Sequence, residues 1–413
     1  MNINWRRTAL GELETETGGV IQTGPFGSQL HMSDYSDEGT PVVMPTNIRD
    51  MRIDPTDIAR VGDEHVDRLV RHQLRPGDIL YSRRGDVEKC ALVTEHETGW
   101  LCGTGCLLVR VQGEHIDTRF LAYQLSTPAK RGWIRQHAVG LTMLNLNTGI
   151  LREIPIELPD FEEQRRIAEV LGALDDKIES NLRTISLSES LILAHFSQLF
   201  NSGHVSAGTA LSDLMEVNPR YSLKRESLAI KVSMQDIPSD SPIINTHSVM
   251  RVGAGSRFSN GDVLFARISP CLENGKTAVV DFLSGSEVGF GSTEFIILSP
   301  RGEISTAWIY ALAREPNFRE ACRQAMSGSS GRQRLSADFF SRYTIATPKE
   351  FDLVAFNKAT MPLLTLMGAR RNENQRLAQL RDALLPEVMS GRMRVNEAGC
   401  LVSEALNEEV ADV

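Results

Sequence analysis

The chain has 413 residues, 41% of them hydrophobic, and a formal net charge of −9 at pH 7. This length exceeds what a single hydrophobic core usually supports, so we expect two domains. No apolar run approaches the roughly 20 residues that span a bilayer, and the N-terminus lacks the pattern of a secretory signal, so we expect a cytoplasmic protein. The acidic balance argues against a protein that holds nucleic acid through a basic surface of its own.

Two copies of one large unit make up most of the chain. The doublet Gly77-Asp78 and the hydrophobic strand after it correspond to Gly261-Asp262 and its strand, and the match continues in order along the chain. The matching segments are 74–93 and 258–280, 104–111 and 292–299, and 118–136 and 306–324. A repeat of this size predicts a pseudo-two-fold molecule rather than a solenoid, and such a molecule suits a bipartite target.

Each copy has the pattern of an α+β domain with a mixed sheet. Short β-branched and apolar runs, separated by glycine and aspartate, predict the strands. The segments 118–138 and 306–326 have apolar residues at helical spacing, and we expect helices there that are interrupted near Pro128 and Pro316.

The cysteines predict neither disulfides nor a metal site. Six cysteines in a chain of this length lack the density of a disulfide scaffold, so we expect reduced thiols. Cys102 and Cys106 lie near His96 and His115, but the second, similarly spaced pair that a zinc site usually needs does not follow. Buried cysteines of a strand are the favoured interpretation.

A long helical segment follows each copy. Apolar residues recur at helical spacing from Asp160 onward, and Asp160 and Glu163 have the spacing of a capping box. A helix over residues 162–200 would be about 58 Å long at 1.5 Å per residue. The second segment contains Pro362, which either kinks it or marks its start, and Gly391 is its expected end.

The apolar stripes of these segments are expected to pack on each other as two long antiparallel coiled-coil helices. The alternative is that each helix folds onto its own domain. The expected packing residues, which also serve partner binding, are Ile167, Leu171, Leu174, Ile178, Leu377, Leu380 and Leu384. The expected divisions are a first domain over 1–160, a helix over 161–204, a second domain over 205–350, a helix over 351–395 and a disordered acidic tail over 396–413.

The motifs of several enzyme classes are missing from the sequence. It has no glycine-rich S-adenosylmethionine loop with an Asn/Asp-Pro-Pro-aromatic motif, no phosphate-binding loop, and neither HExxH nor GxSxG. The strings TGPFGSQL at 23–30 and VNPR at 217–220 have the wrong spacing for a methyltransferase. RRGDVEK at 83–89 has an acid-acid-lysine arrangement but no acidic partner at the end of an upstream strand, so we interpret it as a charged turn.

Three groups of polar loop residues have side chains suited to base edges. Arginine can bind guanine through two hydrogen bonds, and asparagine or glutamine can bind adenine in the same way. The residues expected to contact DNA are Gln22, Thr23, Ser28, Tyr81, Arg83, Arg84, Lys89, Thr142, Asn145, Asn147, Arg267, Lys276, Arg332, Gln333 and Arg334. The alternative is solvated surface side chains, and drift in surface loops would also explain why the copies differ most there.

The long segments resemble those of a known family, the specificity subunits of Type I restriction-modification systems. Residues 158–181, LPDFEEQRRIAEVLGALDDKIESN, are similar to the central conserved region of that family, and residues 372–395, NENQRLAQLRDALLPEVMSGRMRV, to its C-terminal conserved region. TGPFGSQL and the strand that follows Gly-Asp in each half are also similar. The resemblance covers residues 5–395, although the second copy lacks the GPFGS string.

The resemblance implies a non-catalytic subunit that gives a DNA-modifying complex its sequence specificity. Two target recognition domains would each read one half of a split site in double-stranded DNA, held apart by the long helices. The implied partners are two adenine methyltransferase subunits and restriction (motor-nuclease) subunits. The implied cofactors are none in this chain, S-adenosylmethionine in the methyltransferase, and ATP and magnesium in the restriction subunit. Partners that supply the phosphate contacts would reconcile DNA binding with the acidic charge.

Two other functions remain open from the sequence. One is a coiled-coil scaffold that binds proteins and has no DNA specificity. The other is an enzyme with an unrecognised active site. A sequence preference added to the methyltransferase complex would favour DNA reading, and turnover by the purified chain would favour an enzyme.

Overall fold

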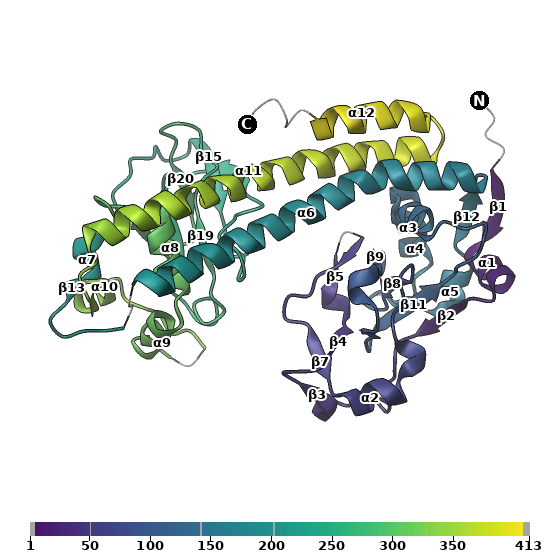
Figure 1. Cartoon of the computed structure of the whole chain (residues 1–413), viewed down its shortest axis with the longest axis horizontal. Coiled ribbons are helices and arrows are strands. Elements are labelled where there is room, and N and C mark those ends of the chain that lie inside the picture. Colours follow the sequence, from purple (N-terminus) through teal and green to yellow (C-terminus); the bar gives the residue numbers. More distant parts are fainter. Residues whose placement is uncertain (1–4, 50, 141–142, 201–202, 330, 408–413) are drawn as a thin grey trace. The chain divides into compact units, whose positions relative to one another are not determined.

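The structure is a computed structural model that describes residues 5–49, 51–140, 143–200, 203–329 and 331–407 (Figure 1). The chain divides into two compact units. Unit 1 consists of Met1–Asp176 and Leu377–Val413, and unit 2 consists of Lys177–Arg376. The two units are described in turn.

Unit 1 contains two four-stranded sheets and two smaller strand pairs. The first sheet has the order β2 (Val20–Thr23), β11 (Cys106–Arg110), β8 (Ile79–Ser82), β9 (Cys90–Leu92). The second has the order β10 (Leu101–Cys102), β4 (Thr40–Val43), β7 (Ala59–Val61), β3 (Tyr35–Ser36). The strand pairs are β1 (Arg6–Ala9) with β12 (Pro155–Leu158), and β5 (Ile48–Arg49) with β6 (Arg52–Ile53). The α-helices are α1 (Leu10–Thr17), α2 (Asp63–Arg68), α3 (Thr118–Ser126), α4 (Pro128–His137), α5 (Thr148–Arg152) and α12 (Val395–Asn407).

Unit 2 has a similar arrangement, with two four-stranded sheets and one smaller strand pair among its described residues. Its first sheet has the order β14 (Glu216–Val217), β21 (Phe295–Ser299), β18 (Val263–Ala266), β19 (Thr277–Val279). Its second has the order β16 (Ser248–Arg251), β15 (Leu228–Val232), β20 (Gly289–Gly291), β17 (Arg257–Phe258). The remaining strands, β13 (Thr209–Ala210) and β22 (Thr344–Ile345), pair with each other. The short helices are α7 (Leu211–Leu214), α8 (Thr306–Arg314), α9 (Pro316–Gln324) and α10 (Phe339–Arg342).

The second sheet of each unit is mixed, because it contains one parallel strand pair. That pair is β10 with β4 in unit 1 and β20 with β15 in unit 2. In each first sheet the central strand, β11 or β21, is antiparallel to both neighbours. The expected α+β class with mixed sheets is confirmed, and the helices of each copy are interrupted at Pro128 and Pro316 as predicted.

The repeated Gly-Asp doublet forms the same turn in both units. Gly77 and Gly261 have φ of 86° and 88°, a region that suits glycine. The carboxylate of the aspartate after each glycine accepts a 2.8 Å hydrogen bond from the backbone N–H three residues earlier, Arg75 in unit 1 and Ser259 in unit 2. The doublet is therefore required by the backbone that leads into β8 and β18, which explains its repetition.

The long helices are α6 (Phe161–Leu199) and α11 (Glu350–Met389), and within each unit they contact each other (Figure 1). In unit 1 Arg381 donates to Asp175 at 2.7 Å. In unit 2 the Asn181 amide donates to Asn374 at 2.8 Å. Pro362 lies within α11 and marks neither its start nor its end.

The long helices also pack on the sheet-bearing parts of the units. In unit 1 Arg119 donates to the Gly172 carbonyl on α6 at 3.1 Å. In unit 2 the buried Tyr310 hydroxyl, on α8, donates to Glu189 on α6. The Asp160 carboxylate accepts from the Glu163 N–H at 2.9 Å and caps α6, while Glu163 itself pairs with Arg166.

The expected disordered tail is instead a helix, α12, over the whole of its described length. Val395, Ala398 and Val402 recur at helical spacing and are 0–5% exposed, so α12 buries an apolar stripe. Gly399 of α12 packs close to α6: a Cβ added at this glycine would lie 3.6 Å from the Val170 side chain. The prediction failed because it weighed the acidic residues and overlooked this stripe. Residues 408–413 lie outside the described part of the chain.

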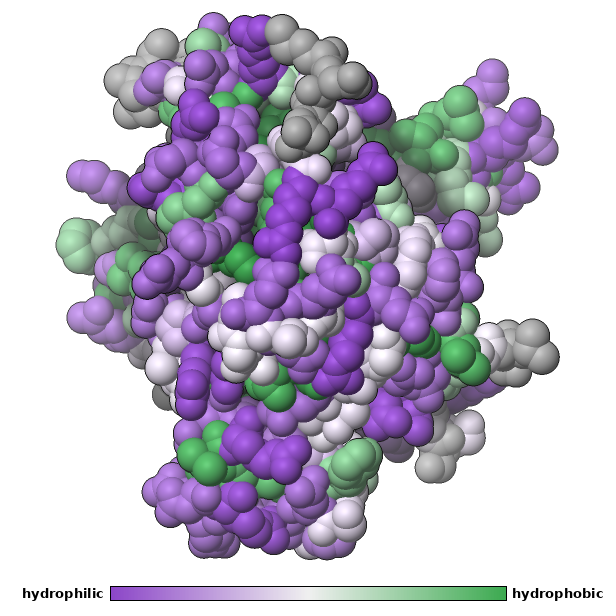
Figure 2. All heavy atoms as spheres, turned by 90° about the vertical axis from the view of Figure 1, so that its right-hand side faces the viewer, coloured by the Kyte–Doolittle hydropathy of each residue, from purple (hydrophilic) through white to green (hydrophobic). Residues whose placement is uncertain are grey.

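The surface near β1 and α1 is mostly hydrophilic, with hydrophobic side chains in small separate groups (Figure 2). Of the helices that the structure describes, none combines the length and hydropathy of a membrane-spanning segment. Cys102 and Cys106 are fully buried in β10 and β11, as predicted. Within the described ranges, no group of three or more His, Cys, Asp or Glu side chains is placed to hold a metal ion.

Candidate nucleic-acid interface

Arg83 and Arg267 occupy equivalent positions, directly after the corresponding strands β8 and β18. Arg83 follows β8, its N–H donates to Gly105 at 2.8 Å, and its carbonyl accepts from Leu146 at 2.9 Å. Arg267 follows β18, its N–H donates to Glu294 at 3.0 Å, and its carbonyl accepts from Leu335 at 2.8 Å. Both side chains are partly buried, and among the described residues neither Nε has a hydrogen-bond partner. A buried, unpaired donor is costly, so both arginines are suited to receive an acceptor from a ligand.

The loop beside each arginine is closed in the same way in both units. Asn145 exchanges two backbone hydrogen bonds with Val139, at 2.8 and 3.0 Å, and Arg334 does the same with Ser327, at 2.9 and 3.1 Å. Each loop begins with a glycine of nearly equal φ, 131° at Gly140 and 130° at Gly328. Asn145 and Arg334 therefore stand at equivalent positions on one backbone frame.

The side chains on this frame differ in chemistry. The Arg334 guanidinium binds the Glu294 carboxylate through Nε at 2.9 Å and Nη2 at 2.7 Å, and its side chain is 43% exposed. These hydrogen bonds lower the pKa of the Glu294 carboxyl and raise the pKa of Arg334. In unit 1 the corresponding positions are held by Asn145 and Gly105, which carry no charge.

The remaining loop residues lie nearby in the chain and vary in exposure. Arg84 forms a backbone bridge with Asn145 and is exposed, as is Arg332. Gln333 is partly buried and its carbonyl accepts from the Ser269 N–H at 3.0 Å. The Asn147 side chain accepts from the Ile150 N–H at 2.9 Å and caps α5. Thr142 lies outside the described residues.

In each unit a polar loop follows the edge strand of the first sheet, β2 in unit 1 and β14 in unit 2. In unit 1 Gln22 donates to the Arg71 carbonyl at 2.7 Å, Thr23 is half-buried at the end of β2, and Ser28 is exposed. In unit 2 the chain leaves β14 through Asn218, whose N–H and side chain both bond to the backbone of Ile297. The VNPR string at 217–220 is therefore the counterpart of the first loop, although it lacks the GPFGS pattern.

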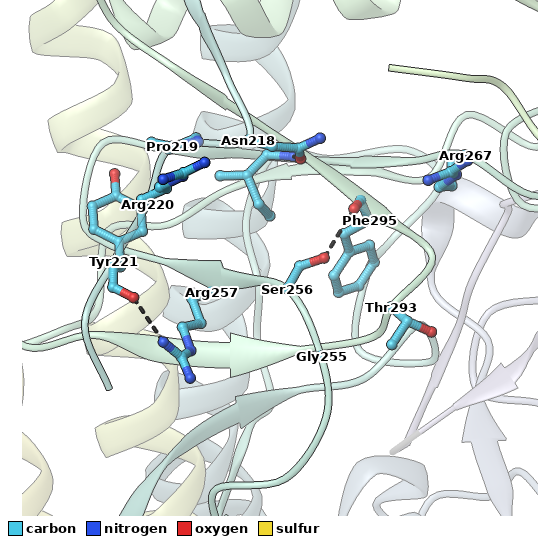
Figure 3. Close-up of a pocket in the computed structure, with 11 residues that line it drawn as sticks. Asn218, Pro219, Arg220, Tyr221, Gly255, Ser256, Arg257, Arg267, Thr293 and Phe295 are labelled. Atoms are coloured by element: carbon cyan, nitrogen blue, oxygen red, sulfur yellow. Dashed lines mark hydrogen bonds between the residues drawn. The ribbon is translucent and has the colours of Figure 1, made fainter. Parts of the chain in front are cut away.

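The loop that follows β14 in unit 2 borders a polar cavity of about 530 Å³ (Figure 3). Arg257 donates to the Tyr221 carbonyl at 2.9 Å, and Ser256 donates to the Phe295 carbonyl at 3.0 Å. The described lining residues include three arginines and no carboxylate: Asn218, Pro219, Arg220, Tyr221, Gly255, Ser256, Arg257, Arg267, Thr293, Phe295 and Ile297. The cavity is suited to an anionic ligand. The sequence prediction found Arg267 and missed the rest, because the topology alone brings these loops together.

Three predicted DNA contacts have other surroundings in the structure. Tyr81 is 0% exposed in β8, so the prediction that it contacts DNA is wrong: every residue of this strand is buried. The Lys276 ammonium donates to the carbonyls of Met234 and Ile237, at 2.9 and 3.0 Å, and so ties two chain segments together. Lys89 forms a 2.6 Å ion pair with Asp86 in a charged turn.

The predicted packing residues form buried or half-buried stripes on the long helices. Exposure is 0–3% for Ile167, Leu171, Leu174, Leu377 and Leu384. Ile178 and Leu380 are half-buried.

Part of the chain is similar to proteins of one described family. Residues 70–186 match the family model of the Type I restriction modification DNA specificity domain. The specificity subunit of the type I restriction enzyme EcoEI from Escherichia coli is 28% identical over 144 residues, 33% of this chain and 24% of that protein. The putative type I restriction enzyme MjaX specificity subunit from Methanocaldococcus jannaschii is 26% identical over 285 residues, 65% of this chain and 64% of that protein. The matches to the EcoEI specificity subunit and to the EcoAI specificity subunit, also from Escherichia coli, span about a quarter of those two proteins.

A solved structure has a similar fold. The crystal structure of the S subunit of a type I restriction-modification system from M. genitalium aligns with 94% of this chain and 96% of that chain, with a TM-score of 0.54 and 16% sequence identity. At that identity the likeness shows the fold. The resemblance stated from the sequence is confirmed by the family model, the relatives and this fold together.

Proposed function

Since the chain is related to the type I restriction-modification specificity subunits, we propose that it reads a bipartite sequence in double-stranded DNA, one half-site with each unit. The observation that supports this most directly is the shared loop frame. Both units close a loop with the same pair of backbone hydrogen bonds but place Asn145 at the equivalent of Arg334. A constant frame with different side chains suits two readers of different half-sites.

The proposed assembly is non-catalytic in this chain and takes its chemistry from partners. Two adenine methyltransferase subunits would dock on the long helices, paired as an antiparallel coiled coil that relates the units by a pseudo-two-fold axis. Restriction subunits would join them. S-adenosylmethionine would be bound by the methyltransferase, and ATP and magnesium by the restriction subunit. Because the chain has a net charge of −9, the partners would supply most phosphate contacts.

Methylation sequencing of genomic DNA tests this function. The chain is expressed with its cognate methyltransferase subunit, and methylated adenines are mapped at single-molecule level. We expect a split motif with a fixed unread spacer that vanishes when this chain is omitted. Replacing Arg332, Gln333 and Arg334 together with alanine should relax one half of the motif and leave the other half unchanged. Methylation without a motif, by an active methyltransferase, would contradict DNA reading.

A second candidate, a protein-binding scaffold without DNA specificity, is favoured by exposed apolar residues on α11. Phe351 is 81% exposed, Val354 50% and Met361 37%, at positions that share one helix face. This face suits a protein partner under either function. The two functions differ in the methylation motif, which a pure scaffold would not create.

A further inference from the structure

The structure assigns different base preferences to Arg334 and Asn145. On the basis of the proposed function, we infer that Arg334, oriented by Glu294, reads a guanine in the half-site of unit 2. Asn145, at the equivalent position of unit 1, reads an adenine in the other half-site. Glu294 is then a positioning residue that acts on DNA through Arg334.

The equivalence of the two positions rests on backbone contacts that recur one by one. Each residue bonds in both directions with the residue that precedes the loop glycine, Val139 or Ser327. Each also bridges the residue after the strand-end arginine, Arg84 for Asn145 and Ile268 for Arg334. The residue that follows is a fully buried leucine in both units, 0% exposed. Each side chain therefore leaves the same frame at the same point.

The geometry of the ion pair leaves one edge of the Arg334 guanidinium for DNA. Glu294 takes the edge formed by Nε and Nη2, with donor–acceptor distances of 2.7–3.0 Å. A guanidinium has five N–H groups. Glu294 accepts from one on Nε and one on Nη2, and the 3.4 Å contact to the Arg332 carbonyl involves one on Nη1, so Nη1 and Nη2 each keep one further N–H. Two parallel donors match the O6 and N7 acceptors of guanine in the major groove.

Asn145 has the complementary chemistry for adenine. Its amide has one acceptor and one donor group, which match N6 and N7 of adenine. The Gly105 carbonyl accepts from the Arg83 N–H as the Glu294 carbonyl accepts from the Arg267 N–H, so Gly105 is the positional counterpart of Glu294 and has no carboxylate to hold a side chain. The clamp also neutralises the charge of Arg334, so Arg334 should contribute to base choice more than to the salt-dependent affinity.

The test compares methylation motifs produced by variants of the full chain with its methyltransferase. Arg334→Ala should relax a single G·C position, reducing preference there roughly 5- to 150-fold, and keep the rest of the motif. Arg334→Lys, which keeps the charge but loses the planar fork, should also relax that position. Glu294→Gln should weaken the same position, and Glu294→Asp, which keeps the carboxylate, should weaken it less. Asn145→Ala should relax one A·T position in the opposite half.

The matched control is the bidentate ion pair between Arg323 and Glu320 on α9, with two 2.8 Å hydrogen bonds. Arg323→Ala and Glu320→Gln should leave the motif unchanged. Retention of the unaffected half-site shows that a variant is folded. An unchanged motif with Arg334→Ala, or relaxation at an A·T position, overturns the assignment while the proposed function stands. The lack of any motif with the wild-type chain overturns both.

Discussion

Replacing Arg110 with methionine should destabilise unit 1 by about 3–5 kcal/mol, because it leaves a buried carboxylate without its cation. Arg110 binds both oxygens of Asp78, through Nε at 2.7 Å and Nη2 at 2.6 Å, and Asp78 is 0% exposed. Methionine fills much of the space of the apolar part of the arginine side chain. The loss of stability therefore comes mainly from the unpaired Asp78 charge, and less from a cavity left by the substitution. At a urea m-value of about 3 kcal/mol/M, the midpoint of unit 1 should fall by roughly 1 M or more.

The assay is urea unfolding followed by hydrogen exchange of peptides from 74–93 and 258–280, which report the two units separately. The double variant Arg110→Met, Asp78→Asn removes the charge that the single variant leaves unpaired. It should therefore recover most of the lost stability. A double variant no more stable than the single one would refute the reasoning, as would equal loss of protection in both units.

Unit 2 provides the internal comparison, because within the described part of the chain Asp262 is bonded by hydroxyl groups and a backbone N–H and by no arginine. Its carboxylate accepts from the Tyr221 hydroxyl at 3.0 Å and from the Ser299 hydroxyl, and burial raises its pKa. Because the pKa is raised, the carboxyl of the folded state stays protonated at pH values where that of the unfolded state has already ionised. Stability therefore falls as pH rises from the pKa of the unfolded state to the pKa of the folded state. Asp262→Asn should thus be neutral or stabilising at pH 7, and its advantage should disappear in acid. Strong destabilisation at pH 7 would show that the ionised carboxylate is required.

Three further variants test other parts of the structure. Burial lowers the pKa of His72 to about 4, so unit 1 should lose up to about 3 kcal/mol as pH falls from 6.5 to 4, and His72→Phe should remove this dependence of the melting temperature. Under the proposed function, Arg332→Ala should reduce the salt slope of DNA binding by about 1 and leave the motif intact, since Arg332 is exposed. Val402→Asp should abolish exchange protection over Val395–Asn407, because Val402 is only 3% exposed, whereas Glu404→Asp should not.

The features that local chemistry dictates could be predicted from the sequence. The glycine of each Gly-Asp doublet has a positive φ, and Pro128 and Pro316 each begin a new helix, so these residues mark turns and breaks wherever they recur. The long helix was expected over 162–200 and is found at Phe161–Leu199, because a stripe of this length has only one consistent period.

The residues whose surroundings differ from the prediction are positioned by tertiary packing. Tyr81 belongs to a strand buried on both faces, where alternation no longer separates inward from outward side chains. Lys276 binds carbonyls of Met234 and Ile237, some 40 residues earlier in the chain, which no local pattern encodes. The arginine-lined cavity likewise combines the loops after β14 and β18, which only the sheet order brings together.

Under the proposed function, the ion pairs of the structure indicate that this chain contributes more to the discrimination between bases than to the affinity for DNA. Several arginines in the described ranges are already neutralised inside their own unit, by Glu14 for Arg152, Asp78 for Arg110 and Glu294 for Arg334. Such pairs hold a backbone frame or orient a side chain, but they release few counterions from DNA. The chain would then supply discrimination between bases, while the methyltransferase partners supply salt-sensitive binding. Raising the salt concentration should accordingly weaken DNA binding by the complex and leave the ratio of its affinities for matched and mismatched sites nearly unchanged. A ratio that falls steeply with salt would show instead that unpaired charges discriminate between the sites.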